Sequence, residues 1–299
     1  MSKSYRLSLL PIVVFAVVAC SGSGATASPS ASAVPPSSAP SESPADFGAI
    51  EHATGKTDVL LRYEEGGGFM MPAFIATQAP IFTLYGDGTV IFRNPFAEAK
   101  QAVGSVFPQN PYRIAKLSED QIQDTLQYAL GDGGLGIAKA SYEDMMISDA
   151  STAVFTVNAG GIKKTVSVYA LGIEMENVPD APARAAFNRL AKRLGDFDQG
   201  GTIKTDLYQP ERYRGILMDG FAAPDQRAWP WADIKPTDFP FPADPNAFQS
   251  AERVLTPAEV AILGLEGVEG GFQGLPLESP DKSKLYSFSL RPLLPDEAK

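Results

Sequence analysis

Short apolar runs, separated by glycine-rich and polar turns, set the pattern of the chain after about residue 50. The clearest example is IFTLYGDGTVIF at residues 81–92, where two apolar runs flank Gly86–Gly88. Glycine supplies the positive φ that a tight turn needs, so this pattern predicts a β-hairpin. A three-residue loop pairs Phe82 with Phe92 and Leu84 with Val90, which gives one wholly apolar face. A two-residue loop breaks this pairing, so we expect the longer one.

Similar runs predict the other strands. Ala153–Val157 and Thr165–Ala170 form a second hairpin, because a loop of two or four residues keeps their apolar side chains on one face. Tyr213–Met218 predicts a further strand, and Leu275–Leu277 with Leu285–Leu290 predicts a third hairpin. An early strand, VLLRY at residues 59–63, is expected to end where Glu64, Glu65 and three glycines follow.

Three helix starts are visible. Ser118 is expected to be an N-cap that forms a capping box with Gln121, followed by an apolar stripe and a stop at Gly131. Thr256 begins the same pattern again near Leu255–Val260. Asp180 is the expected cap of a third helix, which carries an apolar stripe and ends near Gly195.

These elements predict an α+β protein in which antiparallel hairpins form one or two sheets covered by short capped helices, behind a disordered N-terminal tether. We expect a signal peptide at 1–19, an anchor cysteine and tether at 20–50, an α+β module at 51–200, and a smaller α+β module at 201–299 packed on the first.

The first residues have the pattern of an export signal. Lys3 and Arg6 precede the apolar stretch Leu7–Ala19, which is too short to span a bilayer comfortably. Val17-Val18-Ala19-Cys20 resembles the bacterial lipobox, and this resemblance implies that Cys20 carries a lipid and becomes the mature N-terminus. The protein is then extracytoplasmic and anchored to the membrane as a lipoprotein. The alternative is ordinary cleavage after Ala25-Thr26-Ala27, which releases a secreted protein.

The segment from Ser21 to Pro44 is dominated by serine, alanine and proline. Such a segment has too little apolar surface to offset the entropy lost on folding, so we expect a disordered tether. The whole chain has a net charge of −10, which argues against a nucleic-acid partner because nucleic-acid binding needs a basic face.

The composition offers few of the side chains that enzymes use for catalysis. The chain has one histidine, His52, and one cysteine, Cys20, so triads, thiol nucleophiles and zinc or haem sites are disfavoured together. We therefore expect no cofactor, no metal and no catalytic residue. A carboxylate pair remains an alternative, because 35 acidic residues allow one, but the sequence gives no means of choosing it.

Two loops have residues that are common in ligand sites, but neither has the residue pattern of a phosphate-binding or a calcium-binding loop. Gly66–Gly68 is not followed by Gly-Lys-Ser/Thr, and residues 69–72 do not open a helix as a phosphate loop requires, so we expect a flexible turn. The acidic residues of the 131–151 segment lack the alternation of a calcium loop, which favours a solvated loop; they are Asp132, Glu143, Asp144 and Asp149.

A segment rich in aromatic residues and proline, Phe221–Phe248, is the one stretch with possible functional content. Its six prolines forbid a central strand or a regular helix, so we expect an extended strap. Trp229 and Trp231 flank one proline and point to the same side of an extended chain. If exposed, the pair could bind a sugar ring or a proline-rich ligand; if buried, it would seal the core, which the usual burial of large aromatics favours.

The segments FTLYGDGTVIF, VFTVNAGGIKKTVSVYALG and LRPLLPDE, behind the lipobox and the tether, resemble a group of uncharacterised bacterial surface lipoproteins. The resemblance implies the location and the integrity of the fold, and it adds no site. The expected function is non-catalytic binding or interaction at the cell surface, with the membrane as partner through Cys20 and an envelope glycan or protein as the ligand. The alternative is a carboxylate-dependent hydrolase acting on envelope carbohydrate or peptide.

Overall fold

The computed structural model describes residues 48–70, 72–93, 101–143, 147–173, 178–198, 201–243 and 250–297. The signal segment, Cys20 and the tether predicted before residue 48 lie outside these residues, as do Asp144 and the last part of the strap. The described residues form a mixed α+β fold with two sheets, which confirms the predicted class.

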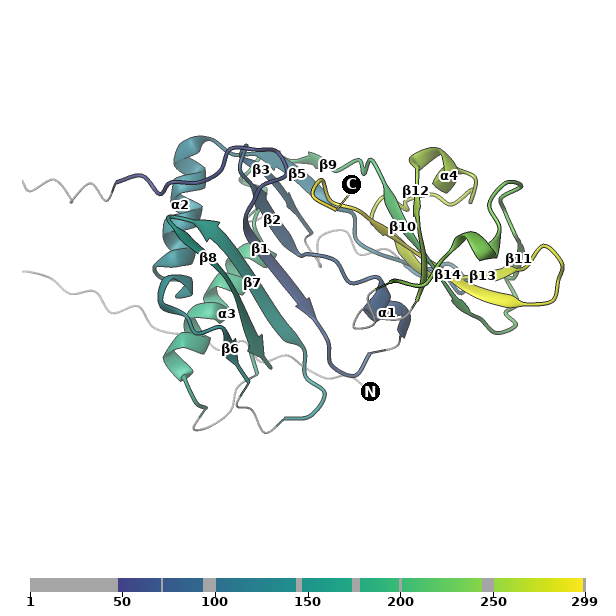
Figure 1. Cartoon of the computed structure of the whole chain (residues 1–299), viewed down its shortest axis with the longest axis horizontal. Coiled ribbons are helices and arrows are strands. Elements are labelled where there is room, and N and C mark those ends of the chain that lie inside the picture. Colours follow the sequence, from purple (N-terminus) through teal and green to yellow (C-terminus); the bar gives the residue numbers. More distant parts are fainter. Residues whose placement is uncertain are drawn as a thin grey trace, which may run out of the picture. The chain divides into compact units, whose positions relative to one another are not determined.

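The first sheet carries the opening hairpin. Its strands are β1 (Val59–Gly66), β2 (Phe82–Tyr85), β3 (Thr89–Phe92), β5 (Arg113–Lys116), β6 (Ser141–Tyr142), β7 (Thr152–Ala159), β8 (Ile162–Tyr169) and β9 (Asp206–Leu207). They lie in the order β6-β8-β7-β1-β2-β3-β5-β9, and all pairs are antiparallel except β6 with β8. The α-helices of the described residues are α1 (Pro72–Ala76), α2 (Glu119–Leu130), α3 (Ala181–Gly195) and α4 (Pro257–Ala261). Helices α2 and α3 lie along one face of this sheet (Figure 1).

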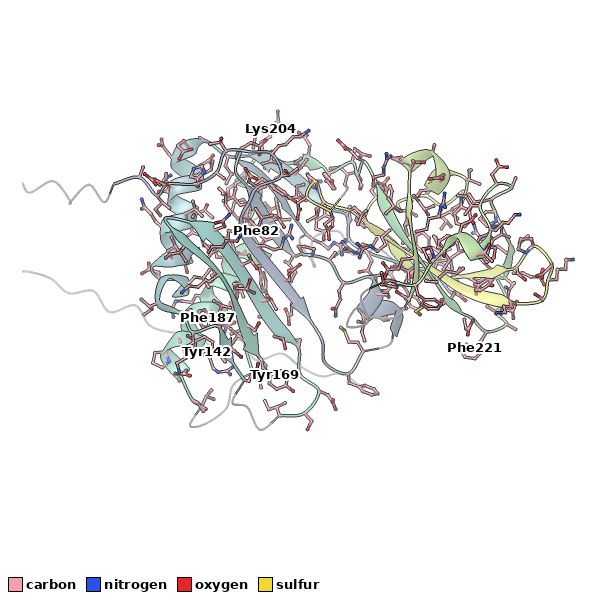
Figure 2. All side chains as sticks on the ribbon, in the orientation of Figure 1. Phe82, Tyr142, Tyr169, Phe187, Lys204 and Phe221 are labelled. Atoms are coloured by element: carbon pink, nitrogen blue, oxygen red, sulfur yellow. The ribbon has the colours of Figure 1, made fainter. Side chains whose placement is uncertain are left out.

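The register of both hairpins in this sheet is as predicted. Phe82 pairs with Phe92 and Leu84 with Val90, and Gly88 in the loop has φ +83°. In the second hairpin the two-residue loop is the one that forms, with Gly160 and Gly161 both at positive φ. The apolar faces of the two hairpins, together with Leu126 of α2 and Phe187 of α3, make the larger core, in which Phe82 and Phe187 are labelled in Figure 2.

Helix α2 begins with the predicted capping box, because Ser118 and Gln121 bond each other's backbone N–H groups. Helix α3 begins differently from our expectation. Asp180 occupies the N-cap position, but its φ of +55° is left-handed and its side chain makes no capping bond. The Asp180 carboxylate instead pairs with Lys139 at 3.0 Å, so the prediction of a side-chain cap there is wrong.

Two expectations around the glycine-rich turn are also wrong. Strand β1 does not end at Tyr63 but continues through Glu64 and Glu65 to Gly66, because β7 offers a full set of antiparallel partners as far as Thr152. The short helix α1 follows the turn, although residues 69–72 carry no helix signal. Gly67 and Gly68 have positive φ, as a turn requires.

The second sheet holds the smaller core. Its strands are β4 (Phe107–Pro108), β10 (Tyr213–Asp219), β11 (Arg227–Ala228), β12 (Ala251–Leu255), β13 (Phe272–Glu278) and β14 (Leu285–Pro292). The order is β11-β13-β14-β10-β12, with β4 paired to β13. Helix α4 starts at the predicted capping box of Thr256 and Glu259. The third hairpin forms as predicted, and its Phe288 and Leu290 are fully buried.

The division into modules at 51–200 and 201–299 stays a prediction. Among the described strands, those before residue 208 build the first sheet and those after residue 212 build the second, and β4 is the exception. The packing of Gly48–Lys299 gathers both sheets into one unit.

The segment after β14 bonds to the first sheet through Asp296 and to Arg291 of β14, in the second sheet, through Glu297. Asp296 accepts hydrogen bonds from Arg62 and from the hydroxyl of Tyr85, both in the first sheet. The hydroxyl of the buried Tyr208 donates to the carbonyl oxygen of Leu293. Leu294 is fully buried in a third apolar cluster with Tyr85, Ile91, Tyr112 and Tyr208. The last residues of LRPLLPDE therefore help to hold the two sheets together.

Candidate binding site

Trp231 is a structural residue of the smaller core. It is 5% exposed, and its ring lies 5.4 Å from that of Phe288, centroid to centroid. The indole N–H donates to the carbonyl oxygen of Glu259 at 2.8 Å, which satisfies the one polar atom that burial would otherwise leave unpaired. Trp231 therefore attaches the strap to α4 and β14, as the sealing interpretation predicts.

Trp229 has a different environment, although only one proline separates the two tryptophans. It is half-buried, and its indole N–H donates to the carbonyl oxygen of Ile234 within the strap. Its ring meets those of Trp231 at 5.2 Å and of Phe239 and Tyr286 at 6.1 Å. Three neighbouring rings hold Trp229 in place while part of its surface stays open to solvent.

The open side of Trp229 lines a pocket of about 760 Å³, which we call the tryptophan pocket. One wall is the strap between Ala228 and Thr237, and the other is the loop between β13 and β14 with Tyr286. This volume lies within the usual range of small-ligand sites, about 300–1,000 Å³. Its lining combines an aromatic floor with lysine, serine, threonine and carboxylate side chains, which suits a ligand that is partly apolar and partly hydroxylated or charged.

The loop on the far wall, Ser279–Lys284, is held by its own hydrogen bonds. Asp281 Oδ1 accepts from the hydroxyls of Ser279 and Ser283 and from the backbone N–H of Ser283. These bonds lower the pKa of Asp281 to about 2, so the carboxylate stays ionised and engaged within the loop. A wall that is already ordered loses little entropy when a ligand binds.

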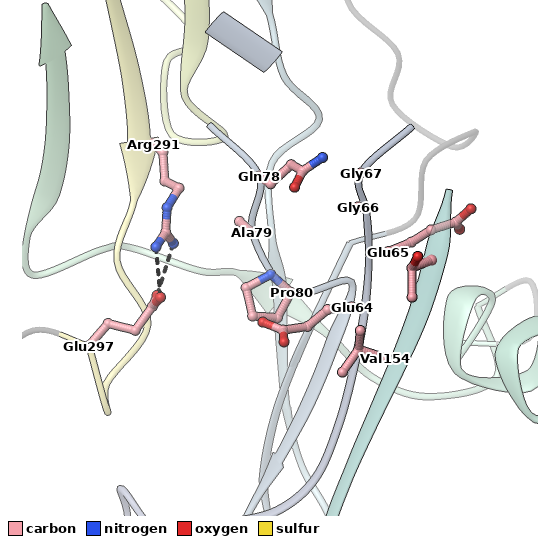
Figure 3. A pocket seen from close by; sticks show the side chains of 11 residues that line it. Glu64, Glu65, Gly66, Gly67, Gln78, Ala79, Pro80, Val154, Arg291 and Glu297 are labelled. Atoms are coloured by element: carbon pink, nitrogen blue, oxygen red, sulfur yellow. Dashed lines mark hydrogen bonds and ion pairs between the residues drawn. The ribbon is translucent and has the colours of Figure 1, made fainter. Parts of the chain in front are cut away.

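A second pocket, of about 380 Å³, lies between strands of the two sheets (Figure 3). We call it the carboxylate pocket; Glu64, Glu65, Gly66, Gln78, Thr152, Arg291 and Glu297 are among the residues that line it. Arg291 donates to both carboxylate oxygens of Glu297, at 2.7 and 3.0 Å. Glu64 points from β1 toward the side of the pocket where this pair lies, whereas Glu65 points away (Figure 3).

The two carboxyl groups of this pocket differ in their electrostatics. Burial raises the pKa of Glu64, and the negative charges of Glu297 and Asp296 add to the effect, although Arg62 and Arg291 oppose it. Burial would also raise the pKa of Glu297, but the hydrogen bonds and the charge of Arg291 outweigh it and hold that pKa below its ordinary value. The pocket therefore brings together one carboxyl group whose pKa is raised and one whose pKa is lowered.

The remaining features are metal ligands, membrane-spanning helices and the single histidine of the chain. Among the described residues, no group of three or more histidine, cysteine or acidic side chains is arranged to hold a metal ion. No helix in the same residues has the length and apolar character needed to cross a membrane. His52 lies beside α2 and bonds to Glu119 and to the carbonyl oxygen of Ala53, away from both pockets.

Comparison with protein-family models, with curated proteins and with solved structures finds no match for this chain. The two pockets are therefore interpreted from their own residues.

Both predicted site residues line the tryptophan pocket, but Trp229 is half-buried whereas Trp231 is almost fully buried in the smaller core. The strap therefore combines both interpretations. The sequence did not indicate Tyr286 or the lysines of the β13–β14 loop as part of the same site, because they lie some fifty residues further along the chain. It also did not indicate Glu64, which was expected to end a strand, or the Arg291–Glu297 pair.

Proposed function

We propose that the chain is an extracytoplasmic protein, anchored to the membrane through a lipid on Cys20, that binds an envelope component without catalysing a reaction. The observation that carries the binding proposal is the half-buried Trp229, which three aromatic rings hold at the edge of the tryptophan pocket. An aromatic side chain fixed before binding offers a large contact area at a low entropic cost.

Cosedimentation with isolated cell-envelope material tests this proposal. Trp229→Ala should lose binding while the variant stays folded, because the side chain is only partly buried. Phe221→Ala is the matched control, since Phe221 is 89% exposed, projects outward (Figure 2) and lines neither pocket. Binding by Trp229→Ala that equals binding by the Phe221→Ala control would refute the role of the tryptophan pocket.

The membrane anchor has a separate test. Cys20→Ser removes the thiol that a lipid would occupy, and we expect the protein to move from the membrane fraction to the soluble fraction. Unchanged fractionation would refute lipidation of Cys20. A wild-type protein found only in the medium would support the alternative of signal cleavage and secretion.

The second candidate function is a carboxylate-dependent hydrolase acting on envelope carbohydrate or peptide. The carboxylate pocket favours it, because general acid–base chemistry uses two carboxyl groups whose pKa values are pushed apart. Glu64 would donate the proton and Glu297 would act as the base. Hydrolysis of envelope polysaccharide or peptide that Glu64→Gln abolishes and Glu65→Gln preserves would support this function; equal activity of the two variants would reject it.

A further inference from the structure

The chain reaches the first sheet through a short segment that α2 and a hairpin loop hold in place. We call residues 50–53 the entry segment, and Figure 1 shows the chain passing α2 before it enters β1. The side-chain amide of Gln123 in α2 accepts from the N–H of Ile50 at 2.7 Å and donates to the carbonyl oxygen of the same residue at 3.0 Å. The N–H of Gly160 donates to the carbonyl oxygen of Glu51. The backbone of the entry segment is therefore attached at two points.

His52 provides a third attachment, through an imidazole ring that is largely covered. Its side chain is 7% exposed, and Nε2 lies 3.1 Å from Oε1 of Glu119 in the first turn of α2. Nδ1 lies 2.7 Å from the carbonyl oxygen of Ala53. Gln123 donates to the same Oε1 at 2.7 Å, which holds the carboxylate beside the ring. Both ring nitrogens of His52 therefore face oxygen atoms.

These contacts fit the protonated imidazole. A neutral imidazole has one N–H, so it donates to one oxygen and sets a nitrogen lone pair against the other, whereas the imidazolium ion donates to both. The carbonyl oxygen of Ala53 can only accept. Hydrogen bonds from Gln123 and His52 lower the pKa of Glu119, so its carboxylate is ionised at neutral pH and also only accepts. Because little water reaches the ring, solvent is a poor substitute for a missing partner.

The electrostatics agree with this geometry. Burial lowers the pKa of His52, but the hydrogen bonds of the ring and the charge of Glu119 outweigh it, so the pKa lies above the ordinary value of 6.5. The other charged residues of the neighbouring elements are exposed or, in one case, paired with each other: Glu51, Lys56 and Asp58 before β1, Asp120 and Asp124 on α2, and the pair of Asp87 with Lys116 beside the opening hairpin loop. Glu119 is therefore the charge that stabilises the proton on His52.

We propose that protonated His52 is a latch that fastens the entry segment to α2, and that loss of its proton loosens residues 50–53. Neutral His52 gives up one of its two hydrogen bonds and leaves the carboxylate of Glu119 without its cation. The bonds of Gln123 and Gly160 involve no titrating group, so the segment opens more often without losing its other attachments. Terminal segments held by few bonds open locally at a low cost in free energy, so a change of one bond shifts this equilibrium.

The direction of the pH dependence follows from the raised pKa of His52. The latch is fully fastened below 6.5, the ordinary value, and it weakens as the pH rises through the pKa of the folded protein. An open entry segment adds four residues, or at most about 14 Å, to the predicted tether. This change in reach rests on the proposed anchor at Cys20, whereas the latch itself does not.

The charge of His52 has a direct measurement. It is the single histidine of the chain, so in the untagged protein an imidazole signal in an NMR pH titration reports this residue alone. We expect a pKa above 6.5 in the wild type and a lower one in Glu119→Gln, because this variant keeps the burial but not the charge. Asp120→Asn is the matched control, since it removes an exposed charge from the same helix turn. A wild-type pKa at or below 6.5, or equal values in the two variants, would overturn the proposal.

Hydrogen exchange tests whether the proton holds the segment in place. The N–H of Gly160 bonds to the entry segment and reports its opening, and the N–H of Gly88, which bonds within its own hairpin loop, is the internal reference. We expect the protection of Gly160 relative to Gly88 to fall about two- to fivefold between roughly pH 6 and pH 8.5, because a pair with the exposed Glu119 contributes modestly. His52→Gln cannot become charged, so its ratio should be low at both values. A wild-type ratio that is independent of pH, or the same change in His52→Gln, would overturn the latch and leave the proposed binding function standing.

Discussion

The ion pair between Arg291 and Glu297 gives the sharpest test of how the C-terminal segment holds the sheets together. The Arg291 side chain is 6% exposed and that of Glu297 is 19% exposed, and the two meet through a pair of hydrogen bonds. Glu297 also accepts a hydrogen bond from the backbone N–H of Leu294 at 3.0 Å. Glu297→Gln keeps the shape of the side chain but removes its charge and sets an amide N–H₂ against the guanidinium.

The expected loss follows from the burial of Arg291. Removing one partner of a buried pair costs about 3–5 kcal/mol, because the remaining charge stays buried without compensation. Glu297 is partly exposed, so we place the loss near the lower end, at about 3 kcal/mol. For a folded unit of this size each kcal/mol lowers the Tm by about 2–4 °C, which predicts a decrease of roughly 6–12 °C.

The stabilisation by the Arg291–Glu297 pair should depend on pH in a direction that follows from the pKa of Glu297. The pKa of Glu297 is lower in the folded protein than its ordinary value of 4.5, so the stabilisation is fully present above that ordinary value. It is lost as the pH falls through the folded pKa, because the protonated carboxyl no longer neutralises Arg291. The Tm difference between the wild type and Glu297→Gln should therefore be large at about pH 7 and shrink at about pH 3.

Thermal unfolding followed by circular dichroism at both pH values measures this difference. Glu266→Gln is the control, because it removes the same formal charge from a side chain that is exposed. Arg291→Met combined with Glu297→Leu should recover much of the loss, since the buried charge is then gone as well. A Tm for Glu297→Gln equal to that of Glu266→Gln at about pH 7 would refute the structural role of the pair.

The other predictions concern local structure and use urea unfolding as the measurement. Ser118→Ala should lower the free energy of unfolding by about 1 kcal/mol through loss of the cap of α2, and Ser118→Asp should preserve it; equal losses in both would argue against the cap. Gly88→Ala should cost roughly 1–3 kcal/mol, because φ is +83° and the added Cβ would lie 2.7 Å from the carbonyl oxygen of Leu117. Gly161→Ala, with similar φ but open space, should cost less; the reverse order would contradict the steric argument. Tyr85→Phe should cost about 1.5–3 kcal/mol, since it removes the 2.7 Å hydrogen bond to Asp296, and an unchanged midpoint would show that the bond contributes nothing.

The features predicted best are those whose causes lie within a few residues. The loop of Gly86–Gly88 determines the register of the opening hairpin, and period-2 alternation determines which of its faces is buried. The capping boxes of Ser118 and Thr256 need only the residue three positions later. Where a long-range partner intervened, local reasoning was wrong: Lys139 takes the carboxylate of Asp180, and pairing with β7 carries β1 through Glu64 and Glu65.

The candidate site divides in the same way. Its tryptophans were identified from the strap, because two aromatic residues flanking a proline are visible without a fold. The sequence does not predict that the two differ in burial, because Trp229 and Trp231 have nearly the same local sequence. The contacts that bury Trp231 come from Phe288 and Glu259, which lie far along the chain. Lys282 and Lys284, which line the same pocket as Trp229, come from the β13–β14 loop.

The sequence by itself determined the α+β class, the hairpin registers and two helix starts. These are local properties, set by turn residues, side-chain alternation and capping bonds. Only the tertiary structure decided which tryptophan is almost fully buried, which residues line the tryptophan pocket with Trp229, and that Arg62 meets Asp296 across 234 residues of chain. The physical reason is that burial, and the pairing of charges that burial enforces, depends on elements distant in the chain, which no local pattern specifies.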